Sequence, residues 1–214
     1  VARWLAKDIN AGKAISFSTT AWKPNERIVG LYRAVADDSE RAGWRLEYET
    51  LTVTERAMKL RGTHRAGDCK PIAVSKSKVL GRGQQKGFGL QTGAMAAVMS
   101  ARGTSIAVAN NINTVWTMAR YAAESIQKFD DVPEDVRLVQ DYLKTEVSQR
   151  FELIAMLDHG VGVHHAGLSD EIRTLMEWLA ESGHLRVLCA TSTIAQGINF
   201  PVSSIFLASR FVPQ

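Results

Sequence analysis

Apolar residues in this chain alternate between short continuous runs and helix-spaced patterns. Runs at residues 105–109, 161–164, 186–190 and 204–208 predict buried strands, and residues 28–33 predict a further one. Between most of these runs, apolar positions recur every three or four residues, which is the pattern of helices packed on one face. Alternating strands and helices predict an α/β fold with a parallel sheet and right-handed crossovers.

Four helices are predicted around these strands. Small residues favour one over 92–100, and Asn113 is the expected N-cap of the next. Pro133 begins a third, predicted to run toward Leu157, and the fourth covers 170–182. The expected apolar faces are Val115, Met118, Ala119, Ala122 and Ile126 in the second helix, Val136, Val139, Leu143 and Val147 in the third, and Ile172, Leu175, Met176 and Leu179 in the fourth.

Capping signals are clearest around the fourth helix. Ser169 is a good N-cap, and Asp170 and Glu171 complement the helix dipole in the first turn. Gly183 is the expected stop.

Patterns in the first half of the chain are weaker. Residues 2–9 favour the end of a helix, and 44–54 alternate well enough for a strand or one arm of a hairpin. Residues 81–89 form a Gly-rich stretch typical of a loop.

Three predicted strands of the second half, those ending at residues 109, 164 and 190, lead into polar turns, and we expect these turns to open on one edge of the sheet. Asn110 and Asn111 follow one strand, and Thr191, Ser192 and Thr193 follow another. Hydroxyl, amide and glycine residues at strand ends are what a phosphate-binding edge of a parallel sheet needs. The alternative is that the asparagines are only turn residues and the hydroxyls only cap a helix.

His164 and His165 follow the strand at 161–164. Adjacent strand residues point to opposite faces, so this pair cannot chelate one ion, and no metal site is predicted. A structural turn with one buried, hydrogen-bonded histidine is the simplest interpretation of the pair, and we expect His164 to pack inside.

Composition is that of a globular α/β chain. Its 214 residues, 45% of them hydrophobic, suffice for one core with a small insertion. No apolar run is long enough to span a bilayer, and no signal peptide is evident. Cys69 and Cys189 are the only cysteines, and the second lies in a predicted buried strand, which favours a reducing cytoplasm over a disulfide framework. The first residue is Val1, so we expect an excerpt of a longer protein.

Positive charge is concentrated in one segment. Residues 59–86 carry a net charge of +7, whereas the whole chain carries +4, so the remainder sums to −3. Such a block is a footprint for a polyanion, although a solvated segment whose charge only maintains solubility is an equal alternative. The candidate basic patch is Lys70, Lys76, Lys78, Arg82 and Lys86.

Two motifs carry a resemblance to a known family. HHAGL at 164–168, followed by ATSTIAQGINFP at 190–201, resembles motifs IVa and V of superfamily 2 DExH-box helicases, in the superkiller-type branch that includes archaeal DNA-repair helicases. WKPNERIVG at 22–30 resembles the segment leading from the first motor domain into the second, and TSIAVANN at 104–111 resembles motif IV. The resemblance leaves residues 34–99 unexplained.

The resemblance implies a RecA-like, P-loop-type second motor domain, truncated, over residues 28–214, with an irregular basic insertion at about 34–99 and with 1–27 as the linker from the preceding motor domain. It also implies contacts with single-stranded DNA or RNA and with the first RecA-like domain of the same chain. The implied nucleic-acid-binding residues are Asn110, Asn111, His165, Gly167, Thr191, Ser192 and Thr193.

For nucleotide, the resemblance implies Gly197 and Asn199 as ATP-binding residues. Asn199 stands where related families often carry Asp, and an amide can hydrogen-bond a ribose hydroxyl but supplies no charge.

Other parts of an ATPase site are missing from the sequence. No G-x-x-x-x-G-K-[ST], no Asp-Glu-x-His and no Q-x-x-G-R-x-G-R occurs between Val1 and Gln214. We therefore expect that ATP and Mg²⁺ serve a longer ATP-dependent helicase whose metal ligands lie outside this chain, and that the chain alone has no catalytic residue and no turnover.

Two other functions stay open. The chain could be a catalytically silent helicase-like scaffold for nucleic acid or protein. An unrelated stand-alone α/β enzyme is the weaker alternative, because no nucleophile–base–acid set is visible.

Overall fold

The structure is a computed structural model that describes five ranges of the chain. These are residues 29–39, 43–50, 62–64, 87–195 and 201–208. The helix expected at 2–9 and the motif at 22–28 lie outside them. The chain divides into two compact units, 1–31 with 49–61 and 32–48 with 62–214. In the first unit the described residues are the ends of two strands, so the account below concerns the second.

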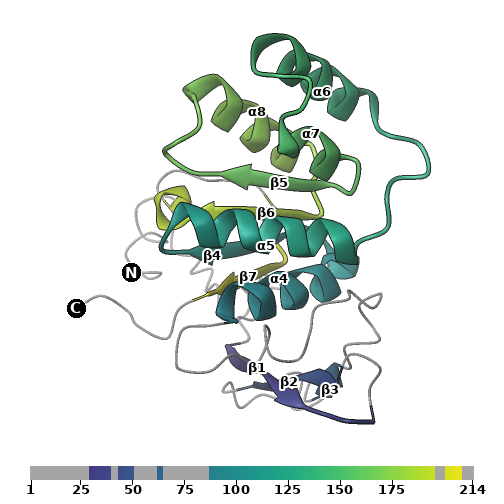
Figure 1. The fold of residues 1–214 in the computed structure, drawn as a ribbon, viewed down its shortest axis with the longest axis vertical. Helices are drawn as coiled ribbons and strands as arrows, with labels where there is room; N and C mark the ends of the chain where they lie inside the picture. The colour runs from purple at the N-terminus through teal and green to yellow at the C-terminus, as the bar shows by residue number, and fades with distance from the viewer. Residues whose placement is uncertain (1–28, 40–42, 51–61, 65–86, 196–200, 209–214) are drawn as a thin grey trace, which may run out of the picture. The chain divides into compact units, whose positions relative to one another are not determined.

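Four parallel strands form the main sheet of the second unit (Figure 1). They are β4 (Ser105–Ala109), β5 (Val161–His164), β6 (Val187–Thr191) and β7 (Ser204–Leu207), in the order β5-β6-β4-β7. All three pairings are parallel. The α/β class, the parallel sheet and these four strands are confirmed to within one residue at each end.

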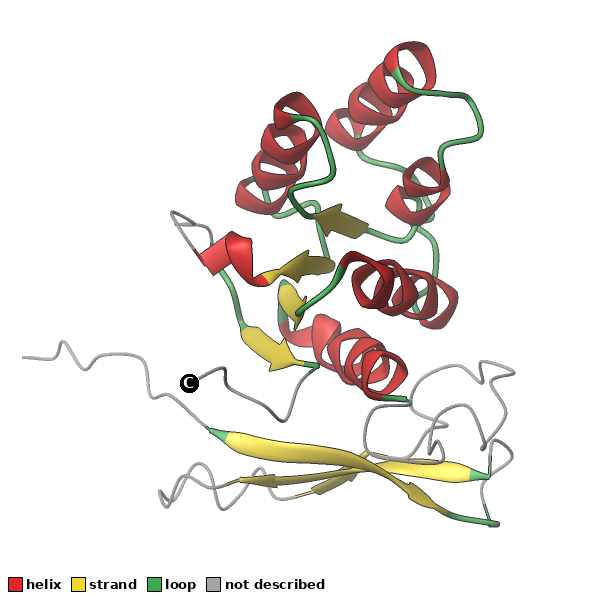
Figure 2. Cartoon of the chain, turned by 60° about the vertical axis from the view of Figure 1, so that its left-hand side comes forward, coloured by secondary structure: helices red, strands yellow, loops and turns green. Residues whose placement is uncertain are grey.

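Helices cover the sheet on both faces. Helices α4 (Phe88–Met99) and α5 (Ile112–Ser125) pack side by side on one face (Figure 2). From β4 the chain crosses over β6 to reach β5 at one edge of the sheet. From β5 it then turns back toward the middle of the sheet to form β6. Right-handed crossovers therefore place α8 (Asp170–Glu181) on the other face.

Two further helices, α6 (Glu134–Glu146) and α7 (Glu152–Leu157), connect α5 to β5. Short 3-10 turns occupy Ser100–Arg102 and Ser192–Ala195. Among the described residues, no helix has the length and apolar content needed to cross a membrane.

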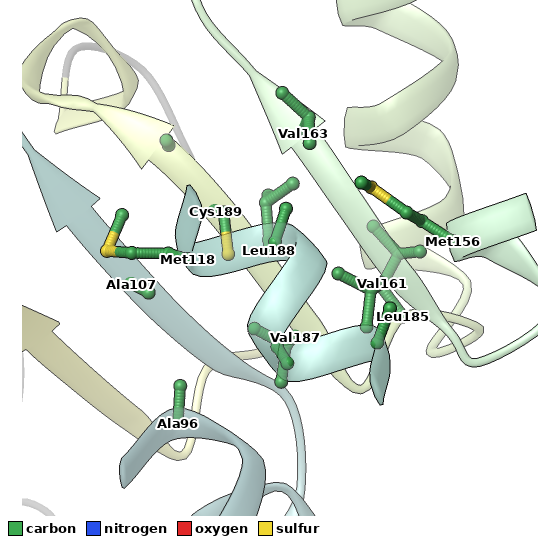
Figure 3. Packing of buried hydrophobic residues seen from close by; sticks show 14 of the residues in the cluster. Ala96, Ala107, Met118, Met156, Val161, Val163, Leu185, Val187, Leu188 and Cys189 are labelled. Carbon is green, nitrogen blue, oxygen red and sulfur yellow. The ribbon is translucent and has the colours of Figure 1, made fainter. Parts of the chain in front are cut away.

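The core lies between the sheet and its helices (Figure 3). Strands β4, β5 and β6 are buried on both faces, which explains why they appear in the sequence as continuous apolar runs rather than alternating ones. Strand β7 was also expected to be buried, but it is the last strand of the sheet and exposes Ile205 and Leu207. Ala107 of β4, Cys189 of β6 and Met118 of α5 are fully buried together in this cluster. Burial raises the pKa of the Cys189 thiol well above its ordinary value, so this cysteine is an inert apolar residue.

The strand predicted at 28–33 does not belong to the parallel sheet. It is β1 (Gly30–Ala36), and it forms a separate three-stranded sheet with β2 (Trp44–Thr50) and β3 (Gly62–His64), in the order β1-β2-β3. Periodicity alone shows that a segment is a strand but not which strands it pairs with, so the pairing predicted from the sequence was wrong.

Tyr32 joins the small sheet to the large one. Its hydroxyl donates to the carbonyl of Leu207 at 2.8 Å and shares a hydrogen bond with Thr92 Oγ1 at 2.7 Å. Its ring meets Phe206 edge to face at 5.7 Å. Burial raises the pKa of Tyr32 to about 12, so the phenol stays protonated as this contact requires.

Several predicted helix boundaries shift. Helix α4 begins at Phe88, so it takes in the end of the Gly-rich stretch, and it packs on the parallel sheet rather than in an irregular segment. The N-cap of α5 is Asn111 and not Asn113, because the Asn111 side chain accepts the Thr114 amide at 2.8 Å. The helix therefore begins directly after the Asn-Asn pair, earlier than the cap prediction assumed.

The helix predicted to run from Pro133 toward Leu157 is broken in two. Helix α6 ends at Glu146, and the amides of Val147 and Ser148 both donate to the carbonyl of Leu143. A turn closed by the Phe151 amide then starts α7. The break shifts the phase of the apolar positions, so Leu153 and Leu157 reach the core whereas Val147 is exposed.

Gly93 allows α4 and α5 to approach closely, and this yields a stability prediction. A Cβ at Gly93 lies 2.8 Å from the backbone oxygen of Met118, whereas for a Cβ at Gly89, one turn earlier, the nearest atom is the side-chain methyl of Thr114 at 2.9 Å and the nearest backbone atom is 3.7 Å away. Gly93→Ala should therefore destabilise the fold by about 1–3 kcal/mol despite the better helix propensity of alanine. Gly89→Ala is the matched control and should cost clearly less in urea unfolding, since a side chain adjusts more easily than a backbone. Equal costs for both would contradict the close backbone approach.

Candidate nucleic-acid interface

Three of the polar turns predicted from the sequence meet at one edge of the sheet. The register pairs Ala109 with Thr191 and His164 with Ala190, so the carboxyl ends of β4, β5 and β6 are level. Neighbouring strands lie about 4.8 Å apart, which places the three turns side by side. Along the edge the order is the HHAG turn, the Thr-Ser-Thr turn and the Asn-Asn turn. The expectation that the loops after 109, 164 and 190 open on one edge is confirmed.

The Asn-Asn turn leads directly into α5. Asn110 and Asn111 are exposed, and the side-chain oxygen of Asn111 is occupied by capping the helix. The first turn of α5 contains no acidic residue. Its amides and helix dipole therefore leave a region of positive potential at the edge, which suits an anion.

The two histidines of the HHAG turn point to opposite faces of the sheet. His164 Nε2 donates to Glu177 Oε1 of α8 at 2.7 Å, and a carboxylate can only accept, so this nitrogen carries the proton. His165 packs instead against Trp116 of α5, edge to face at 6.0 Å. One dipeptide thus fixes the turn to the helices on both faces.

His165 is an internal part of the turn. Only 4% of its surface is exposed, and its Nδ1 accepts the amide N–H of Gly167 at 3.0 Å. A ring so buried cannot meet a phosphate directly, which differs from the expectation for this residue. It shapes the loop so that Ala166 and Gly167, both exposed, present backbone at the edge.

Burial also sets the protonation of His165. Desolvation, helped by the neighbouring His164, lowers the pKa of His165 below its ordinary value. With Nδ1 acting as acceptor, the neutral ring carries its proton on Nε2, and this buried atom has no hydrogen-bond partner. A positive charge there would be both desolvated and close to His164, so the ring is held neutral.

Gly167 is required by the tightness of the same turn. A Cβ at this position lies 3.1 Å from His165 Nδ1 and 3.3 Å from Ile112 Cδ1 at the start of α5. The HHAG turn therefore packs directly on the beginning of the helix that follows the Asn-Asn turn.

The Thr-Ser-Thr turn occupies the middle of the edge. The Oγ1 atoms of Thr191 and Thr193 lie 2.8 Å apart in a hydrogen bond, and Ser192 and Thr193 are exposed. After β6 the chain continues in the 3-10 turn Ser192–Ala195. Three hydroxyls here face solvent or one another at the centre of the three turns.

The other helix start at this edge has the opposite charge. Asp170 and Glu171 lie in the first turn of α8, directly after the HHAG turn. These carboxylates offset the α8 dipole and repel a phosphate. The edge is therefore favourable to an anion on the α5 side and unfavourable on the α8 side.

Some predicted residues fall outside the described part of the chain. They are Gly197 and Asn199 of the ATP prediction and Lys70, Lys76, Lys78, Arg82 and Lys86 of the basic patch. Within the described residues, no three His, Cys, Asp or Glu side chains are arranged to hold a metal ion.

Trp116 and Glu177 are the site residues that sequence reasoning missed. Trp116 also meets Phe151, edge to face at 6.0 Å, so it stands between His165 and the start of α7. Phe151 and His165 lie 35 and 49 residues after Trp116 in the chain, so no local sequence pattern connects the three residues. Glu177 lies seven residues after the first residue of α8, on the helix face next to His164. The only sequence signal for this contact is that adjacent strand residues point to opposite faces, which directs His164 toward one of the flanking helices.

Several known proteins are similar in sequence to this chain. No protein-family model matches the chain. An ATP-dependent DNA helicase Hel308 from Caldivirga maquilingensis is 27% identical over 191 residues, covering 86% of this chain and 24% of that protein. A Hel308 from Pyrobaculum calidifontis is 28% identical over 193 residues, covering 87% of this chain and 26% of that protein.

A third relative is the human U5 small nuclear ribonucleoprotein 200 kDa helicase, 38% identical over 69 residues, or 31% of this chain and 3% of that protein. The chain is homologous to superfamily 2 helicases. It spans about a quarter of the length of the archaeal helicases it matches. Its helix-flanked parallel sheet is consistent with a motor domain of such helicases.

The buried, neutral His165 generates a pH prediction. Because its folded pKa lies below its unfolded value of about 6.5, its contribution to stability is present above that pH and is lost as pH falls. His165→Asn removes the titrating ring and keeps an acceptor near the Gly167 amide. The variant should lose less stability than the parent chain between pH 7 and pH 5, by up to about 1.4 kcal/mol per pH unit. Urea unfolding at several pH values measures this, and parallel curves for the two proteins would contradict it.

Proposed function

We propose that this chain is the second RecA-like motor domain of an ATP-dependent helicase or translocase of the superkiller-type branch, over residues 28–214, with 1–27 as the linker from the first motor domain. The level edge formed by the three polar turns carries the proposal. The homology of the chain to helicases supports the assignment, because motors of this superfamily bind nucleic acid.

The edge suits the backbone of single-stranded DNA or RNA rather than its bases. The groups that it presents are hydroxyls at Thr191–Thr193, exposed backbone at Gly167 and the N-terminus of α5. All of these bind phosphate oxygens and read no sequence. The strand path follows the α5 side, away from Asp170 and Glu171.

Gly197 and Asn199 provide this domain's part of the nucleotide site in the proposal. ATP supplies a phosphoanhydride whose binding and hydrolysis close and open the cleft between two motor domains. The Walker lysine and the Mg²⁺ ligands belong to the first motor domain, since the printed sequence contains neither motif. We expect the 214-residue chain alone to bind nucleic acid without ATP turnover.

Thr191→Ala in the complete helicase tests the edge. One neutral hydrogen bond to a phosphate is worth about 0.5–1.5 kcal/mol, so single-strand affinity should fall roughly threefold to tenfold when it is removed. Unwinding per ATP hydrolysed should fall with it, because the moving domain grips the strand less firmly. Fluorescence anisotropy with a labelled oligonucleotide measures the affinity.

Thr145→Ala is the matched control for this test. The Thr145 hydroxyl is also exposed but bonds within its own helix α6, to the carbonyl of Asp141, away from the edge. This variant should bind like the parent. Equal binding by both variants would remove Thr191 from the interface, and a fall in both would point to a general loss of structure.

The basic segment is tested separately through salt dependence. Changing Lys70, Lys76, Lys78 and Arg82 to Gln should flatten the slope of log affinity against log salt, by a little under one unit for each phosphate that these side chains neutralise. A control variant removes the same charge from Arg120, Lys128, Arg137 and Lys144, each of which pairs with an acid on the surface. If both variants change the slope equally, the basic segment acts only through net charge.

A further inference from the structure

Helices α6 and α8 lie side by side on the β5 side of the sheet (Figure 1). Their side chains enclose a groove of about 630 Å³. Apolar and aromatic side chains form most of it. Its main lining residues are Leu138 and Tyr142 of α6, with Leu175 and Trp178 of α8, and Asp170 and Glu171 stand at one end.

The apolar lining is exposed to an unusual degree for helices that are otherwise amphipathic. Leu138 keeps 58% of its surface exposed and Trp178 keeps 38%. The opposite faces of the same helices bury Val136, Leu143 and Met176 in the core. A leucine and a tryptophan in a concave site are typical anchors of a protein–protein contact.

The two helices that form the groove carry a net negative charge. Helices α6 and α8 together carry eight acidic and three basic residues. The three basic residues, Arg137, Lys144 and Arg173, each pair with a nearby aspartate. The charged residues that line the groove are both acids. Such a surface repels nucleic acid and attracts a positively charged partner.

The walls of the groove determine the form of that partner. Both walls are helices, so they offer no strand edge to which an extended segment could add its backbone hydrogen bonds. A helix satisfies its own backbone and can lay an apolar stripe between two others, as in ridge-and-groove packing. We infer that the groove between α6 and α8 binds a basic amphipathic helix of a partner protein. This inference is independent of the proposed function, since it uses no residue of the nucleic-acid edge.

The test uses a synthetic amphipathic helix of about 18 residues, long enough to populate the helical state. It carries leucines on one face and lysines elsewhere, and a counterpart has every lysine replaced by glutamate. Anisotropy of the labelled peptides is measured against the 214-residue chain. The lysine peptide should bind at least about tenfold more tightly than the glutamate peptide, and added salt should reduce the difference.

Two arginine variants locate the binding. Leu138→Arg places a charge in the groove, and Val147→Arg places the same charge on another exposed apolar residue at the end of α6, outside the lining. Leu138→Arg should weaken the lysine peptide at least about tenfold, whereas Val147→Arg should stay within about twofold of the parent. Circular dichroism establishes that both variants are folded.

Other results overturn the inference. If both arginine variants weaken the peptide equally, binding is bulk electrostatic attraction and the groove is not the site. If the glutamate peptide binds as tightly, the occupant is not basic. If the chain alone dimerises in sedimentation and Leu138→Arg abolishes the dimer, the occupant is a second copy of this chain.

Discussion

The parallel register of β4, β5 and β6 is the constraint on which the rest of the structure depends. Each of these strands is covered by helices on both faces, so a polar side chain within a strand would be buried without a hydrogen-bond partner, which is unfavourable. Polar residues are therefore displaced to the strand ends. Because the strands run in the same direction and are level, three separate polar turns become one continuous edge. A single antiparallel strand in this set would separate those turns.

The His164–His165 pair converts that edge into a defined surface. A strand ending in one buried polar residue would be anchored to one helix only, whereas this dipeptide reaches α8 through Glu177 and α5 through Trp116. The arrangement leaves His164 Nδ1 and His165 Nε2 buried without partners, which carries an energetic cost. The two unpartnered nitrogens lie in the side chains that anchor the exposed HHAG turn to α8 and α5.

Sequence predicted the parts of this fold that local patterns determine. The four strands of the parallel sheet, the Ser169 cap and the Gly183 stop are all confirmed, since apolar runs and capping chemistry are local signals. It failed where tertiary contacts decide. Nothing local shows that β1 pairs with β2, or that the helix after Pro133 breaks so that Phe151 can meet Trp116.

For the candidate site too, local sequence signals predicted some features and tertiary packing decided the others. Residue type and strand-end position were enough to indicate Thr191, Asn110 and the HHAG turn as one edge, because parallel strands force their carboxyl ends together. They were not enough to show that His165 lies inside the turn. Whether an imidazole at a strand end faces solvent or a helix depends on Trp116, a residue of another element whose position only the packing of α5 fixes.

Charge separates the two surfaces that the fold exposes. Helix α5 begins at the edge without an acid in its first turn, whereas α8 begins there with Asp170 and Glu171. The same two carboxylates also stand at one end of the groove between α6 and α8. They therefore act on both surfaces, since they repel a phosphate backbone from the α8 side of the edge and attract a cationic helix into the groove. The phosphate backbone is therefore kept to the α5 side of the edge, whereas a basic helix is drawn to the groove, so the two ligands occupy separate surfaces of this domain.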